Sequence, residues 1–153
     1  MQETVVKPLS PLEYAAWAGL LRTHAELVRE LDHELVEAYG LPLTQYEVLI
    51  RLADAPDRRM RMTELARSVF LSQSGVTRLV DRLEAQGLVV REPCPEDRRG
   101  LHARLTDAGS DLLARARPSH LAGVRTLFLQ HFDDDELRAL AAAWERVSQH
   151  GPL

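Results

Sequence analysis

The chain has 153 residues, of which 45% are hydrophobic and 27% charged, with a formal net charge of −4. These values are typical of one soluble globular domain, here residues 1–153. No apolar run reaches the length of a membrane span, residues 1–10 lack the apolar stretch of a signal peptide, and a single cysteine excludes an internal disulfide. We therefore expect a cytoplasmic protein.

Positive charge is concentrated in one part of this acidic chain. Residues 58–104 contain ten arginines and six acidic residues, a local balance of +4, and the rest of the chain has a balance of −8. A basic segment favours a polyanionic partner, although charge clusters are also common on ordinary solvated surfaces.

The first predicted element is a long helix over residues 11–39. Apolar residues recur on one stripe at helical spacing: Trp17, Leu20, Leu21, Leu27, Val28, Leu31, Leu35 and Ala38. Gly40 followed by Pro42 ends it. A helix of this length is expected to pack against a second chain, because a small domain cannot cover all of it.

Three shorter helices follow. Thr44 to Glu47 has the pattern of a capping box that starts a helix ending near residue 53. Residues 58–61 form a basic connector, and Thr63 caps a helix over 64–69. A turn over 71–75 leads into a helix that ends at Gly87, with a buried stripe of Val76, Leu79, Val80 and Leu83.

After Gly87 the apolar period changes from 3.6 to 2, which predicts strands over 88–92 and 101–105 around a turn over 93–100. Thr106 then caps a helix that reaches about residue 132 with a kink at Pro118, and a last helix starts at 133–136. The order predicts a mainly α fold, a winged helix-turn-helix over 44–105 with a two-stranded wing.

The helix before the hairpin has a face suited to a DNA groove. Ser74, Arg78, Asp81 and Ala85 lie opposite its apolar stripe, flanked by Thr77 and Arg82. The hydroxyls and Gln73 can bond base edges, and Arg78 can reach guanine O6 and N7 together. We expect Asp81 to orient Arg78 or Arg82. Alone, this helix fits a solvated amphipathic helix slightly better, but the helix before it and the hairpin after it favour DNA.

The hairpin tip carries the remaining basic cluster. Arg98 and Arg99 are placed on the turn, with Arg91 and Arg104 on its strands. Arginines beside a recognition helix can lie along the DNA backbone or enter the adjacent minor groove, which favours arginine where it is narrow. Asp97 is expected to accept hydrogen bonds from Arg99 and fix its direction. The alternative is a turn decorated with solvating charge.

The stretch ELARSVFLSQSGVTRLVDRLEAQGLVVREPCPEDRRGLHARLTDAG resembles the MarR family of bacterial transcription regulators. The resemblance implies a homodimer built from helices over 11–39 and 106–149, a pseudo-palindromic operator, and release by a small aromatic or phenolic ligand. It also implies that the recognition helix and Arg99, oriented by Asp97, contact DNA. The full expected DNA-binding set is Thr63, Ser72, Gln73, Ser74, Thr77, Arg78, Arg82, Asp97, Arg98 and Arg99.

The family's ligand cleft lies between its first, second and fifth helices. The resemblance therefore implies that an effector would contact Trp17, His24 and Tyr46. Alternatively, His24 is hydrogen-bonded at the dimer interface. Metal binding by His24, His120 and His131 is a weaker possibility, since they lack a close ligand spacing. We expect neither a metal nor a cofactor.

Redox sensing by Cys94 is also weakly supported, because family thiol sensors place the cysteine near the N-terminal helix. We expect Cys94 to be an exposed, isolated thiol. No nucleophile–base pair or phosphate loop suggests an enzyme. The alternative to a ligand-responsive repressor is a winged-helix module that binds DNA constitutively or binds a protein partner.

Overall fold

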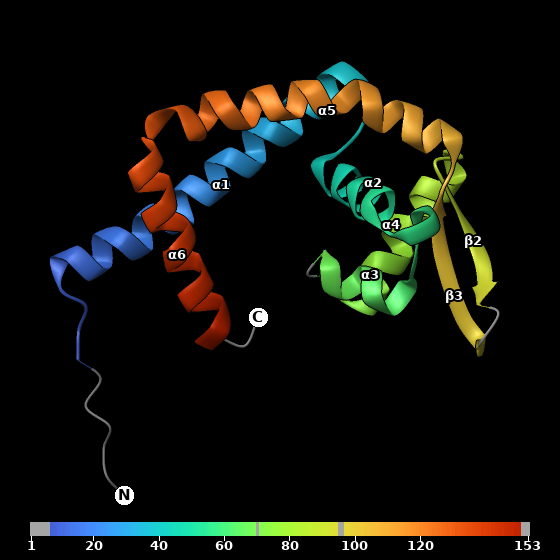
Figure 1. The fold of residues 1–153 in the computed structure, drawn as a ribbon, viewed down its shortest axis with the longest axis horizontal. Helices are drawn as coiled ribbons and strands as arrows, with labels where there is room; N and C mark the ends of the chain where they lie inside the picture. Colours follow the sequence, from blue (N-terminus) through green and yellow to red (C-terminus); the bar gives the residue numbers. More distant parts are fainter. Residues whose placement is uncertain (1–6, 70, 95–96, 151–153) are drawn as a thin grey trace, which may run out of the picture.

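The chain folds into a winged helix-turn-helix carried by long helices, as seen in a computed structural model (Figure 1). The structure describes residues 7–69, 71–94 and 97–150, without the side chains of residues 97–99 and 149–150. The elements are α1 (Pro11–Tyr39), α2 (Leu43–Asp54), a 3-10 turn η1 (Pro56–Arg58), β1 (Arg59–Arg61), α3 (Met62–Ser68), α4 (Gln73–Ala85), β2 (Val89–Cys94), β3 (Asp97–Leu105), α5 (Asp107–Leu127), a 3-10 turn η2 (Leu129–His131) and α6 (Asp134–His150).

Helix α1 has the predicted bounds. Ser10 caps it in a capping box with Glu13, and Gly40 ends it in the left-handed conformation at φ 62°. Within this helix of 29 residues only Leu35 is buried, so most of the predicted apolar stripe is uncovered in the single chain. Helix α5 packs along it and spans the molecule from the wing to α6 (Figure 1).

The second helix starts differently from the prediction. Helix α2 begins at Leu43, with Pro42 as its N-cap residue, and Thr44 makes no cap hydrogen bond. The Leu43 N–H instead donates to Asp32 Oδ1 of α1, at 2.8 Å. The predicted capping box is wrong, because a carboxylate distant in the sequence satisfies the first backbone donor.

The basic connector is partly a strand. β1 pairs with β3, giving a three-stranded antiparallel sheet in the order β1-β3-β2, with Met60 opposite Ala103. Helix α3 starts at Met62 with Arg61 as its N-cap residue, so Thr63 is inside the helix and not its cap. Pairing with a strand 40 residues away has no local signal, which explains why a connector was expected.

The wing is longer than predicted. Val89 pairs with Leu105 at its base, and the ladder continues through Pro93 opposite Leu101 to Cys94 opposite Asp97. Pro93 is tolerated because β2 is an edge strand, where a missing N–H removes no second pairing. The strands therefore include most of the predicted turn over 93–100, and Cys94, expected to be exposed, is 5% exposed.

The core lies beneath the winged helix and reaches the adjoining parts of α1 and α5. Its largest fully buried side chains are Tyr46, Leu35, Leu41, Leu49, Leu52, Leu65, Leu83, Leu105, Val48, Val76, Val80 and Val89. The predicted stripe of α4 is buried in full. Thr106 caps α5 as predicted, accepting from the Gly109 N–H at 3.0 Å. Helix α5 continues across Pro118 but ends at Leu127, five residues early, before η2.

None of the helices in the described part of the chain is long and apolar enough to span a membrane.

Candidate nucleic-acid interface

The first turns of α4 present a slim polar surface. Ser72, Gln73, Ser74, Thr77 and Arg78 are all exposed there, while the opposite face of the helix is buried in the core. A helix whose exposed face carries short polar side chains fits the width of a DNA major groove.

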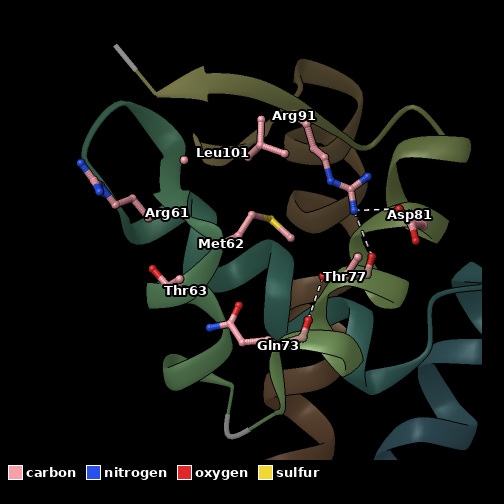
Figure 2. A pocket seen from close by; sticks show the side chains of 9 residues that line it. Arg61, Met62, Thr63, Gln73, Thr77, Asp81, Arg91 and Leu101 are labelled. Atoms are coloured by element: carbon pink, nitrogen blue, oxygen red, sulfur yellow. Dashed lines mark hydrogen bonds and ion pairs between the residues drawn. The ribbon is translucent and has the colours of Figure 1, made fainter. Parts of the chain in front are cut away.

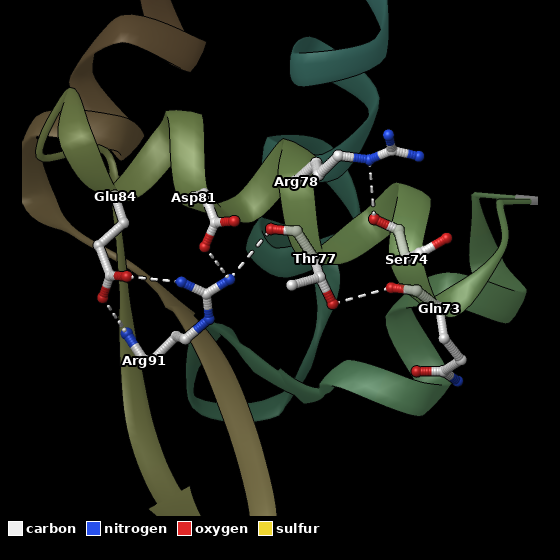
Figure 3. A network of polar contacts seen from close by, with 7 residues as sticks. All are labelled: Gln73, Ser74, Thr77, Arg78, Asp81, Glu84 and Arg91. Atoms are coloured by element: carbon white, nitrogen blue, oxygen red, sulfur yellow. Dashed lines mark hydrogen bonds and ion pairs between the residues drawn. The ribbon is translucent and has the colours of Figure 1, made fainter.

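Several of these polar groups make hydrogen bonds to the backbone of the helix itself. Ser72 Oγ accepts from the Gly75 N–H at 3.1 Å, which makes Ser72 the N-cap. Thr77 Oγ1 donates to the Gln73 carbonyl oxygen at 2.8 Å, so its lone pairs face outward as acceptors. Arg78 Nε donates to the Ser74 carbonyl oxygen at 3.3 Å, and its guanidinium extends beyond the helix surface (Figure 3).

A hollow of about 440 Å³ separates this helix from the wing. Its lining comes from α3, α4, β1 and both wing strands: Arg61, Met62, Thr63, Gln73, Thr77, Asp81, Arg91, Gly100 and Leu101 (Figure 2). The structure thus brings the expected residues Thr63, Gln73 and Thr77 around one concave surface. The sequence did not single out Arg61, Met62 or Leu101 as site residues. β1 was not predicted, and the predicted strand over 101–105 carried no signal that Leu101 faces α4.

Asp81 has a different partner from the two arginines expected. Its Oδ1 lies 2.7 Å from Arg91 Nη2, on strand β2. Arg91 also pairs with Glu84 at 2.7 Å and donates to the Thr77 carbonyl oxygen at 3.0 Å (Figure 3). A signal for this was present in the sequence, since Arg91 follows the buried Val89 by two residues and so shares its inward face of the strand.

Other arginines of the basic segment are paired within the protein. Arg104 Nε lies 2.5 Å from Glu92 Oε1 across the hairpin, and Arg58 lies 3.2 Å from Asp107 at the start of α5. Glu92 is already counted in the local charge balance of +4, so only the Arg58–Asp107 pair, whose carboxylate lies outside residues 58–104, reduces it. The predicted basic wing strands therefore hold Arg91 and Arg104 chiefly as structural cations.

The structure describes only the backbone of the three expected wing-tip residues. The backbone of Asp97, Arg98 and Arg99 belongs to β3 and not to the turn that was predicted. The side chains of these three residues are not described, so the orientation of Arg99 by Asp97 stays a prediction.

The expected effector residues are distributed between two helices. Tyr46 on α2 is 1% exposed, and its ring centroid lies 4.4 Å from that of His120 on α5. Among the described residues, neither the Tyr46 hydroxyl nor His120 Nδ1 has a hydrogen-bond partner. By contrast, Trp17 is 54% exposed on α1, and His24 on the same helix is exposed.

Burial favours the neutral form of both rings. It raises the pKa of Tyr46, an effect opposed by Arg117, and it lowers the pKa of His120, an effect opposed by Glu34. Both rings are therefore neutral near pH 7. Burial likewise raises the pKa of Glu47, against the opposing charges of Arg51 and His24.

The described residues hold no group of three or more His, Cys, Asp or Glu side chains placed to bind a metal.

Comparison with known proteins decides the family. A model of the MarR family matches residues 39–100. The crystal structure of Sco3205, a MarR family transcriptional regulator from Streptomyces coelicolor in complex with DNA, is 34% identical, with a TM-score of 0.90 over 94% of this chain and 91% of that one. The chain belongs to the MarR family.

Other relatives agree with this assignment. AbsC, a MarR family regulator from Streptomyces coelicolor, is 33% identical with a TM-score of 0.90, over 95% of this chain and 97% of that one. The transcriptional repressor YetL of Bacillus subtilis is 26% identical over 129 residues, 80% of this chain and 77% of that protein. The MarR-family chain is thus a DNA-binding transcriptional regulator and not an enzyme.

Proposed function

We propose that this MarR-family regulator is a homodimeric repressor that binds a pseudo-palindromic operator and is released by a small aromatic or phenolic ligand. The observation that carries the DNA-binding part is the slim polar start of α4, exposed beside the wing over a buried apolar face. The proposed contacts are those expected from the sequence: Thr63, Ser72, Gln73, Ser74, Thr77, Arg78, Arg82, Asp97, Arg98 and Arg99. The relationship to the repressor YetL supports repression.

Uncovered apolar surface supports the dimer. Leu12, Tyr14 and Trp17 of α1 are 80%, 64% and 54% exposed, and Trp144 and Val147 of α6 are 42% and 56% exposed. Several large apolar side chains exposed on the outer helices of a single chain indicate an interface. We assign dimerisation to residues 11–39 and 106–149, and DNA binding to residues 44–105.

The buried rings of Tyr46 and His120 support a ligand site between α1, α2 and α5. Their unpartnered polar atoms match a phenol, which can donate or accept, or a carboxylate, which can accept from an O–H or N–H donor. The proposed site comprises Tyr46 with Trp17 and His24 of α1. The test is a thermal-shift screen with benzoate, salicylate and simple phenols, followed by DNA binding with each compound that raises the Tm. If stabilising compounds leave DNA affinity unchanged, the protein is not ligand-released.

The DNA-binding proposal is tested with the duplex that the wild-type protein selects from a random pool. Arg78→Ala should cost about 1–3 kcal/mol on this duplex and flatten the preference at one base position, because it removes a base contact. Arg99→Ala should weaken binding more evenly across major-groove base changes and reduce the salt dependence, because its target is the minor groove or a phosphate. Failure of the wild type to select any sequence at low salt would refute the proposal.

A further inference from the structure

The recognition helix and the wing are joined by one cluster of charged side chains, which we name the Arg91 clamp: Arg91 on β2, with Asp81, Glu84 and the Thr77 carbonyl on α4. Arg91 Nη1 lies 2.7 Å from Glu84 Oε2, and Arg91 Nη2 lies 2.7 Å from Asp81 Oδ1. The Arg91 backbone N–H also donates to Glu84 Oε1, at 3.0 Å. The Glu84 carboxylate therefore accepts hydrogen bonds from both the side chain and the backbone of Arg91.

The cation of the clamp is more enclosed than that of the neighbouring Arg104–Glu92 pair, while its partners Asp81 and Glu84 are 57% and 40% exposed. The Arg91 side chain is 18% exposed, compared with 39% for Arg104 in its pair with Glu92. A guanidinium with three acceptors in a part-buried site has little rotational freedom, since each planar N–H must keep its direction. The Arg104–Glu92 pair differs in a second way, because both partners belong to the hairpin.

The clamp lies directly behind the proposed reading surface. Thr77, whose carbonyl receives Arg91, carries one of the exposed hydroxyls, and Asp81 follows it by one turn. Helix α4 and β2 are also joined by the short turn after α4, where the Leu88 N–H donates to the Leu83 carbonyl oxygen at 2.9 Å, and by the core at the base of the strand, where Val89 is buried with Leu83. A short turn fixes where the strand begins but leaves its angle to the helix to side-chain contacts farther along.

We propose that the Arg91 clamp is a positioning device for DNA recognition, with Arg91 and Asp81 setting the angle of the wing to the recognition helix. Arg91 is a positioning residue and not a DNA contact, although it belongs to the basic segment. Asp81 has the same role. This role explains why the helix proposed to face DNA phosphates carries a carboxylate at this position. This inference rests on the proposed DNA-binding function.

Removing Asp81 distinguishes positioning from simple electrostatics. Asp81→Ala removes a negative charge near DNA and introduces the best helix-forming residue, so charge and helix propensity alone predict equal or tighter binding. Positioning predicts weaker binding instead, by about tenfold, comparable with the loss of one base contact. Glu92→Thr is the matched control, because it removes one carboxylate from the hairpin without touching the clamp.

Each variant is titrated on the duplex selected by the wild type, well below its Tm, and then examined by footprinting. Asp81→Ala and Arg91→Met should retain protection of guanine N7 in the major groove, but lose protection from hydroxyl radicals in the flanking minor groove. Glu92→Thr should retain both. Equal or tighter binding by Asp81→Ala, or a uniform loss of both protections, would overturn the clamp as a positioning device. Failure of the wild type to bind would instead refute the proposed function.

Discussion

Gly109 lies where α5 begins, against the turn that follows the recognition helix. A Cβ atom at this position would stand 2.2 Å from the Leu88 carbonyl oxygen and 2.7 Å from Leu105 Cδ1. That carbonyl oxygen also accepts from the Thr106 N–H at 3.1 Å, so it cannot move without breaking the junction of wing and helix. A glycine is needed here for close approach of two backbones, and not for an unusual φ.

Gly109→Ala is therefore expected to lower the free energy of unfolding by about 3 kcal/mol, at the upper end for overpacking, because backbone must shift. Ala108→Ser is the matched control, since residue 108 is exposed and should change stability by less than about 0.5 kcal/mol. Urea unfolding of both variants measures the difference. Equal stability of the two would show that the contact relaxes freely.

At the scale of elements, α2 depends on α1 for its start. The Asp32 carboxylate of α1 accepts from the Leu43 N–H, while Thr44, the capping residue expected from sequence, makes no cap hydrogen bond. The contact joins the long outer helix to the first helix beneath the DNA-binding surface. A change in the position of α1 would therefore reach α2 through this bond.

We expect Asp32→Ala to destabilise the fold by about 1 kcal/mol, the usual loss for an N-terminal cap. Thr44→Ala should stay within about 0.5 kcal/mol of the wild type, since an exposed side chain without a capping role is replaced. Thermal unfolding of both variants at one protein concentration provides the comparison. The reverse ranking would restore the capping box predicted from the sequence.

The elements that the sequence predicted correctly have signals within a few residues. The bounds of α1 follow from Pro11 and Gly40, the buried stripe of α4 from helical spacing, and the start of α5 from Thr106. Three of the errors involve distant partners. β1 needs β3, the cap of α2 needs Asp32, and the extra length of the wing needs pairing beyond Pro93.

In the candidate site, too, local features could be predicted from the sequence and contacts between distant residues could not. The exposed polar residues of α4 could be read from a helical wheel, because the exposed face is a local property. The partner of Asp81 had only an indirect signal: strand alternation places Arg91 on the same face as Val89, but it does not say which helix residue Arg91 meets. The burial of Tyr46 against His120 likewise depends on packing between α2 and α5.

At the scale of the whole molecule, charge and apolar surface are divided between its two ends. Polar and basic side chains surround α4 and the wing, while most of the large exposed apolar side chains lie on α1 and α6. The ends of α1 and α6 lie far from the wing (Figure 1). Part of the basic charge is neutralised internally by Asp81, Glu84, Glu92 and Asp107. We therefore expect strong operator binding to depend on the proposed dimer rather than on the charge of one copy.

The central claim is that a dimer places two recognition helices on one face of DNA, about 34–36 Å apart. It is tested most directly by inserting five base pairs, half a helical turn, between the two half-sites of the selected duplex. The affinity of the wild-type protein should fall by about 100-fold or more, to that of a single half-site, because the second helix then meets the wrong face. Unchanged affinity after the insertion would contradict the account.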